Sequence, residues 1–326
     1  MGRLLRLQLL HLSLNSFSGK FPSNISHCTQ LRVLNVISNE LTGSIPDQLG
    51  SLLKLTHLWL QGNHLTGKIP EWIGNFSSLY SIALGDNNLQ GRIPNQLGRL
   101  TSLGNFLVWS NNLSGMVPSS IYIIIHIFSV TDNQLRGELP QNVGITLPNL
   151  EVFAGDVNKF TGTVPASLSN ASRLRLLDFA EDNSLGSGKD GDLTSLNFLA
   201  NCTNLEVLSF SRNHLGGELP DSIANLSTKL RIFTIGGNLI YGPLPTGIGN
   251  LVNLTTLGIE QNHIGVSLPD VIGKLYKLEG LYLNLNIFSG PIPSSLGNLT
   301  SVTRLFMKGN RFEGSIPPSL GNCQNL

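Results

Sequence analysis

The chain has 326 residues, a formal net charge of +1 and only 13% charged residues, about half the share found in ordinary soluble domains. It lacks the basic stripe expected of a protein that binds nucleic acid or an acidic membrane surface, so we predict no nucleic-acid partner and no direct membrane contact. The most apolar stretch, 121–130, is too short to span a membrane and contains His126. Its Ile125, Phe128 and Val130 are instead predicted to face a protein core.

One unit recurs from end to end and is clearest at residues 55–79, where the pattern is L-x-x-L-x-L-x-x-N-x-L-x-G-x-I-P-x-x-I-G-N. Its first asparagine marks the phase, and the marks lie mostly 24 residues apart. The thirteen marks are Asn15, Asn39, Asn63, Asn87, Asn111, Asn133, Asn158, Asp182, Asn213, Asn238, Asn262, Asn286 and Asn310. A fixed period of this length with this leucine spacing predicts a leucine-rich-repeat solenoid.

Within a unit, the leucines two residues apart predict a short strand. Leu58 and Leu60 should face the core, while His57 and Trp59 point to the opposite side. Parallel strands stacked about 4.8 Å apart would form a sheet with one apolar side. The amide of Asn63 is expected to bond backbone groups of the neighbouring turns that would otherwise be buried without partners.

Glycine follows the phase mark by four residues and proline by seven, as in Gly67 and Pro70. The exceptions are Val266, which replaces the glycine, and Lys189, which replaces the proline. The segment L-x-G-x-I-P resembles the plant-type leucine-rich repeat, which implies a second short strand and a superhelical twist. The predicted fold is therefore an α/β repeat solenoid, a curved superhelix with a parallel β-sheet on its concave face and short helical or 3-10 turns on its convex face. We expect a single solenoid over 1–326, with about 13 repeats and without a cap at either end.

The pattern breaks after Asp182, because the next mark lies 31 residues further on. We interpret 184–203 as an irregular repeat with an insertion, and 192–200 as a short helix with Asp192 at its N-cap. The insertion also contains the spacing G-x-G-x-x-G at Gly186, Gly188 and Gly191, which occurs in dinucleotide-binding proteins. We reject that reading, because the first glycine belongs to the repeat and no βαβ unit surrounds the motif.

The residues show no catalytic constellation and no metal-ligand spacing, so we predict a protein that is not an enzyme and uses no cofactor or metal. The three cysteines, Cys28, Cys202 and Cys323, fall at equivalent repeat positions several coils apart. That separation is too large for a disulfide, and buried thiols are expected.

The second half resembles one plant receptor-kinase subfamily more specifically. The motifs that carry this resemblance are D-L-x-x-x-x-F-L-x-x-C-T-x-L from Asp192, L-G-G-E-L-P at 215–220, S-I-A-N-L-S-T at 222–228 and N-L-I-Y-G-P-L-P at 238–245. The subfamily includes the flagellin and elongation factor Tu receptors and a rice bacterial-blight resistance receptor, and the chain is most similar to the elongation factor Tu receptor type.

The resemblance implies the extracellular ligand-recognition region of a plant receptor-like serine/threonine kinase. Such a region would sense a microbial peptide or protein in innate immunity and signal through a smaller leucine-rich-repeat co-receptor kinase. It would lie on the extracellular side of the plasma membrane. The signal peptide, paired-cysteine caps, membrane helix and kinase of that family are not found in these residues, so a fragment or a truncated receptor remnant is also considered. A soluble leucine-rich-repeat binding or inhibitor protein is a further alternative.

Eight N-x-S/T sequons occur, six of them in the same convex part of the repeat, and they favour a secreted glycoprotein. The predicted glycosylation sites are Asn24, Asn75, Asn112, Asn170, Asn201, Asn225, Asn253 and Asn298.

Ligand recognition is predicted on the concave face, because folding leaves the outward strand positions free to vary. Two tryptophans two coils apart are typical of interface anchors, and an acidic middle followed by a basic end would suit an extended peptide of complementary charge. The candidate residues are His57, Trp59, Asp86, Trp109, Asp132, Asp156, Asp178, Glu181, Arg212, Glu260, Tyr282, Arg304, Phe306 and Lys308. The tryptophans could also do no more than cover neighbouring side chains.

Overall fold

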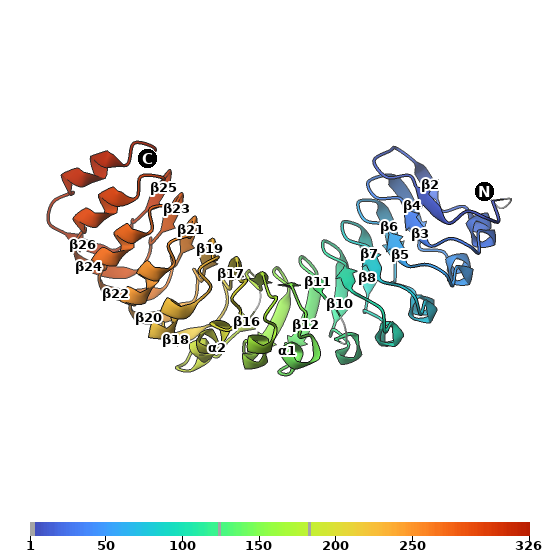
Figure 1. Ribbon diagram of the computed structural model, residues 1–326, viewed down its shortest axis with the longest axis horizontal. Coiled ribbons are helices and arrows are strands. Elements are labelled where there is room, and N and C mark those ends of the chain that lie inside the picture. Colours follow the sequence, from blue (N-terminus) through green and yellow to red (C-terminus); the bar gives the residue numbers. More distant parts are fainter. Residues whose placement is uncertain (1–3, 123–124, 182–183) are drawn as a thin grey trace. The chain divides into compact units, whose positions relative to one another are not determined.

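The structure is a computed structural model that describes residues 4–122, 125–181 and 184–326. It comprises two compact units, one formed by 1–137 and 152–159 and the other by 138–151 and 160–326. The phase mark Asp182 lies outside the described residues, as do two positions of the apolar stretch 121–130. In both units each repeat contributes a first strand, a second strand and a short helical turn (Figure 1).

The first strands pair in parallel and in chain order within each unit. In the first unit they are β1 (Leu9–His11), β3 (Val33–Asn35), β5 (His57–Trp59), β7 (Ser81–Ala83), β9 (Asn105–Leu107), β11 (Ile127–Ser129) and β13 (Val152–Ala154). In the second unit they are β15 (Leu176–Asp178), β17 (Val207–Ser209), β19 (Ile232–Thr234), β21 (Thr256–Gly258), β23 (Gly280–Tyr282) and β25 (Arg304–Phe306).

The second strands, which the L-x-G-x-I-P segment predicted, also pair in parallel. In the first half of the chain they are β2 (Ser18–Lys20), β4 (Glu40–Ser44), β6 (His64–Gly67), β8 (Asn88–Gly91), β10 (Asn112–Gly115), β12 (Gln134–Glu138), β14 (Lys159–Gly162) and β16 (Ser184–Leu185). The remaining ones are β18 (Gly216–Glu218), β20 (Leu239–Pro243), β22 (His263–Ser267), β24 (Ile287–Pro291) and β26 (Arg311–Glu313). The pairing of second strands is interrupted between β16 and β18.

Single 3-10 turns follow the repeated prolines in most coils. They are η1 (Ser23–His27), η2 (Asp47–Ser51), η3 (Glu71–Asn75), η4 (Asn95–Arg99), η5 (Ser119–Ile121), η6 (Ala166–Asn170), η8 (Asp221–Asn225), η9 (Thr246–Asn250), η10 (Asp270–Lys274), η11 (Ser294–Asn298) and η12 (Pro318–Asn322). The sixth repeat has the α-helical turn α1 (Val143–Thr146) instead, and the irregular repeat has η7 (Asp192–Ser195) followed by α2 (Leu196–Leu199).

The core lies between the first strands and the turns of each coil. Leu58 and Leu60 are fully buried, and Ile125, Phe128 and Val130 are buried as predicted. The helix predicted over 192–200 is present as η7 and α2. The part of the chain that the structure describes contains no helix long and apolar enough to cross a membrane.

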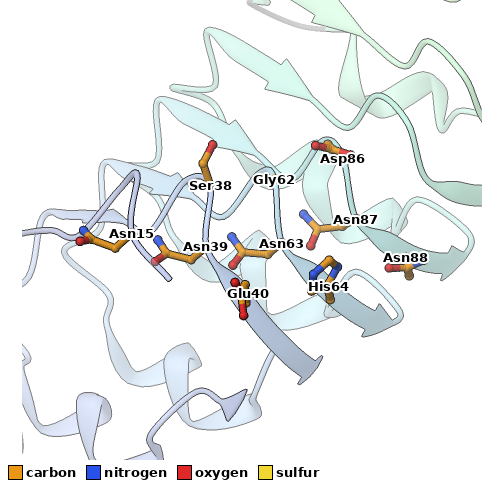
Figure 2. Close-up of a pocket in the computed structure, with 10 residues that line it drawn as sticks. All are labelled: Asn15, Ser38, Asn39, Glu40, Gly62, Asn63, His64, Asp86, Asn87 and Asn88. Atoms are coloured by element: carbon orange, nitrogen blue, oxygen red, sulfur yellow. The ribbon is translucent and has the colours of Figure 1, made fainter. Parts of the chain in front are cut away.

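The phase-mark asparagines form the predicted ladder along each unit, and Figure 2 shows Asn15, Asn39, Asn63 and Asn87 in a row. Asn63 Nδ2 donates to the carbonyl oxygens of Val36 on the preceding coil and of Leu60 on its own coil, both at 3.0 Å. Its Oδ1 accepts the backbone N–H of Leu41, again at 3.0 Å. Asn63 Nδ2 also donates to the carbonyl oxygen of Gln61 at 3.3 Å. One side chain therefore bonds backbone groups of two coils, which explains why the pattern keeps this residue type.

Two positions of each repeat adopt the left-handed backbone conformation. The first is the residue immediately before the phase mark, occupied by Leu14, Ser38, Gly62, Asp86, Ser110, Asp132, Val157, Glu181, Arg212, Gly237, Gln261, Leu285 and Gly309. The second lies four residues after the mark and is glycine in every described repeat except one, where Val266 has a φ of 67°. The repeated glycine is thus required by backbone geometry, because only glycine adopts this conformation without a steric penalty.

Candidate functional site

The outward residues of the first strands, with the residues that flank each strand, form a surface that we call the strand face. Strand register determines which of its side chains are neighbours: Trp59 pairs with Ala83 in the first unit, and Tyr282 pairs with Phe306 in the second. The fourteen candidate ligand residues are all on this surface, but they are distributed over many coils. The structure joins only some of them into local clusters.

An aromatic cluster lies at the centre of the strand face of the first unit. The rings of His57 and Trp59 meet edge to face with centroids 5.0 Å apart, and Tyr80 lies 5.9 Å from His57. Trp59 Nε1 donates to the hydroxyl of Ser81 at 2.9 Å, and Ser81 is only 2% exposed. Partial burial lowers the pKa of His57, because the charged imidazolium would lose solvation there.

The tryptophans and Tyr80 lie over small residues of adjacent coils. A Cβ added at Gly85 would be 2.6 Å from the Trp109 ring, and one at Gly104 would be 2.4 Å from Tyr80. The aromatic rings therefore take the volume that glycine leaves free, and they do cover neighbouring residues. Tyr80 was missed by the sequence analysis because it precedes the strand by one residue, although the glycine at the same position of the next coil is a readable signal.

Acidic candidates of the first unit lie along one rim of the strand face. Ser110 Oγ donates to the carboxylate of Asp132 at 2.8 Å, and Thr131 Oγ1 donates to that of Asp156 at 2.6 Å. Next to this rim, the asparagine ladder forms the floor of an open polar groove of about 410 Å³ (Figure 2). It is lined by Asn15, Ser38, Asn39, Glu40, Gly62, Asn63, His64, Asp86, Asn87 and Asn88.

Ion pairs occur on the strand face of the second unit. Arg212 Nη1 lies 3.9 Å from Glu181 Oε2, and both side chains are largely exposed. Arg175 and Glu206, which the sequence analysis did not select, form a closer pair at 3.1 Å. Surface pairs of this kind contribute little to stability. Asp178 accepts the backbone N–H of Ala180 at 3.1 Å and so has a local structural role.

At the last coils, Tyr282 and Phe306 are stacked with centroids 5.3 Å apart and planes 9° apart. Arg304 and Lys308 are exposed on either side of Phe306. On the same face, Glu260 lies two coils before Phe306.

The glycine-rich insertion is already occupied by a side chain of its own chain. The Asp192 carboxylate accepts the N–H groups of Ser187 at 2.8 Å, Gly188 at 2.9 Å and Lys189 at 3.3 Å. It also accepts the N–H of Gly216 on β18 at 3.0 Å. Consecutive N–H groups of this kind form an anion-binding nest, and here the anion is the carboxylate.

The predicted N-cap at Asp192 was wrong, because Gly191 holds the N-cap position with a φ of 99°. Asp192 faces back into the insertion, where it is 7% exposed. Burial alone would raise its pKa, but the hydrogen bonds from Ser187, Gly216 and Lys189 outweigh burial and lower it.

The remaining sequence predictions concern sequons and thiols. Seven sequon asparagines are exposed and Asn253 is half-buried; Asn112 lies on β10, next to the asparagine ladder, rather than on a turn. All three cysteines are buried, and burial raises the pKa of Cys202 to about 11. Within the described residues, no group of three or more His, Cys, Asp or Glu side chains is placed to hold a metal ion.

The coil geometry, the asparagine ladder and the strand face together define a leucine-rich-repeat protein. The family description Leucine Rich Repeat matches residues 6–28, 30–52, 54–76, 204–226, 277–299 and 301–323. The structure is similar to a crystal structure of a TDR receptor, with a TM-score of 0.91 and 34% identity over 100% of this chain and 55% of that one. It is also similar to the plant peptide hormone receptor RGFR1 in complex with RGF2, with a TM-score of 0.84 and 31% identity over 100% of this chain and 55% of that one.

Among curated proteins, the chain is similar to the LRR receptor-like serine/threonine-protein kinase EFR of Arabidopsis thaliana, at 52% identity over 79 residues. That alignment covers 24% of this chain and 8% of the relative. The chain is therefore a leucine-rich-repeat solenoid whose homologues are plant LRR receptor kinases, and its structural neighbours are the ectodomains of such receptors. The predicted fold class and the predicted resemblance are both confirmed.

Proposed function

We propose that this chain is the ligand-recognition region of a plant receptor kinase and that it binds an extended peptide along the strand face. The proposal rests on the types of residue found at the outward strand positions. Folding demands only that these positions point away from the core, yet they hold two tryptophans, a stacked tyrosine–phenylalanine pair and an ordered series of charges. Aromatic and charged groups of this kind supply most of the binding energy at protein interfaces.

The comparisons support a peptide as the ligand. One similar structure is described as a plant peptide hormone receptor in complex with RGF2. A peptide in extended conformation also suits a stack of parallel strands, because its side chains could reach successive coils. The microbial origin of the ligand, the co-receptor kinase bound near the C-terminal coils, the location outside the plasma membrane and glycosylation at the eight sequons are further parts of the same proposal.

The test is selection of phage-displayed dodecapeptides on the immobilised chain. We expect enrichment of a restricted set of peptides, and at least a tenfold weaker binding of these peptides by the triple variant Trp59→Ala, Trp109→Ala, Asp178→Ala. Lys274→Ala, an exposed change on turn η10, is the matched control and should bind normally. Binding that survives the triple substitution unchanged would mean that the ligand site lies elsewhere.

A further inference from the structure

A strip without side chains crosses the strand face of the second unit diagonally. Its members are Gly236, Gly258 and Gly280. They lie on three successive coils, and from one coil to the next the glycine is two residues further before the phase mark. Strand register sets Gly258 beside Thr234 and Tyr282, and Gly280 beside Thr256. None of the three is among the described glycines that have a positive φ. The turn geometry that explains other glycines of the repeat therefore does not explain these.

The Glu260 side chain lies over this strip. A Cβ at Gly236 would be 2.4 Å from Glu260 Oε1, and one at Gly258 would be 3.2 Å from Oε2. At the next coil, a Cβ at Gly280 would be 2.8 Å from the ring of Tyr282. The strip is therefore bounded by a carboxylate at one end and by the stacked pair Tyr282 and Phe306 at the other, with Phe306 44% exposed.

The Glu260 carboxylate is poorly satisfied in this position. Its Oε2 is buried and has no hydrogen-bond partner among the described residues. Burial raises the pKa of Glu260, and this effect outweighs the hydrogen bond from its own backbone N–H and the attraction of Arg212. A buried acceptor without a partner is costly, and a carboxylate is more costly than a neutral group. Since the outward position needs no carboxylate for folding, the cost points to a role in binding.

We infer that Glu260 is a recognition carboxylate that receives the basic side chain of an extended peptide, whose backbone crosses the coils of Gly236, Gly258 and Gly280 above the Glu260 and Tyr282 side chains that cover these glycines. The inference rests on the proposed function and specifies its ligand. Neither of the two glycines beneath Glu260 carries a Cβ that would oppose a change in its side-chain rotamer, and such a change would turn Oε2 toward the ligand. A guanidinium supplies paired N–H donors that match both carboxylate oxygens, and the rings of Tyr282 and Phe306 offer an apolar surface to a neighbouring side chain of the same peptide.

The test uses the same dodecapeptide library and the full chain. We expect the selected peptides to share an arginine or lysine. The most enriched peptide is then synthesised in two forms, with its basic residue intact and with glutamine in its place. On the wild type, the glutamine form should bind about tenfold or more weakly, whereas Glu260→Gln should bind both forms equally weakly. Glu313→Gln, a change at an exposed carboxylate on the second strand β26, is the matched control and should retain the difference between the two peptides.

Thermal unfolding of each variant verifies the fold, and Glu260→Gln preserves the shape of the side chain. The inference is overturned when Glu260→Gln still discriminates between the two peptides, or when the selected peptides share no basic residue; the proposed function survives both results. A wild-type chain that selects no peptide at all overturns the proposed function and the inference together.

Discussion

Val266 is the residue at which the repeat departs most clearly from its own backbone requirement. It has a φ of 67° and is 64% exposed, so burial of its side chain offsets little of the backbone strain. A left-handed conformation costs an ordinary residue about 1–2 kcal/mol relative to glycine, and a β-branched side chain is a pronounced outlier there. The sequence marked this position as the exception to the glycine pattern, and the structure adds that the exception is strained.

We therefore expect Val266→Gly to raise the free energy of unfolding by about 1 kcal/mol, because relief of strain exceeds the extra entropy of the unfolded chain. The matched reverse change is Gly290→Val at the same position of the next repeat, where φ is 72° and the nearest atom to an added Cβ is 4.0 Å away. That variant should lose about 1–2 kcal/mol. Urea denaturation measures both, and effects of the same sign in the two variants would contradict this account.

In the glycine-rich insertion after β16, one side chain supplements the backbone hydrogen bonds. The Asp192 carboxylate joins three N–H groups of the insertion to the edge strand β18. The sequence indicated a break and a following helix correctly. It could not indicate the nest, because the direction of one carboxylate depends on the positions of four N–H groups from separate parts of the repeat.

The lowered pKa of Asp192 predicts a specific pH dependence. The folded state favours the carboxylate, so the stabilisation is complete above the ordinary pKa of an aspartate and is lost as the pH falls through the lowered folded pKa. Asp192→Asn should remove this stabilisation, lower the free energy of unfolding by about 2–3 kcal/mol at neutral pH and flatten the acid limb of the stability curve. Chemical denaturation as a function of pH measures the effect, and the exposed Asp221→Asn is the control. A parallel acid limb in Asp192→Asn and wild type would exclude the carboxylate as its source.

Glu260 contributes in the opposite direction over its own pH range. Its folded pKa is raised, so the folded state binds a proton more readily than the unfolded state, and stability falls as the pH rises from the ordinary pKa to the raised one. The two carboxylates can thus be separated by substitution, because their contributions to the pH curve differ in sign.

At the scale of the whole molecule, the repeat pattern was enough to predict the strands, the buried leucines and the asparagine ladder, because each depends on a spacing of a few residues. The clusters of the strand face were less predictable. Pairs such as Tyr282 with Phe306 arise from the register between coils, and the position of Trp109 over Gly85 depends on which outward neighbours lack a side chain. Sequence reasoning selected these residues singly, but their packing partners come from coils about 24 residues away.

The ladder predicts which neighbouring coil is destabilised when one of its asparagines is replaced. Asn63→Ala would leave Leu41 N–H without its acceptor, and a buried group of this kind costs about 1–3 kcal/mol. The carbonyl groups of Val36 and Leu60 would each lose one donor and keep the amide of Asn39 or Asn87. We expect the free energy of unfolding to fall by about 1–3 kcal/mol. Leu41 belongs to the preceding coil, so amide hydrogen exchange should accelerate more over 33–44 than over 81–91. The exposed Asn88→Ala serves as the control, and equal acceleration on both sides would argue against a directional ladder.

The three tryptophans of this chain are distributed in a way that makes the molecule its own optical probe. Trp59 and Trp109 lie on the strand face, whereas Trp72 lies on turn η3 and donates to Asp47 at 2.9 Å. A ligand that binds the strand face of the first unit would alter the fluorescence emission of Trp59 and Trp109. The emission of Trp72 would stay unchanged and serve as an internal reference. Occupancy could then be followed by fluorescence in the unlabelled protein.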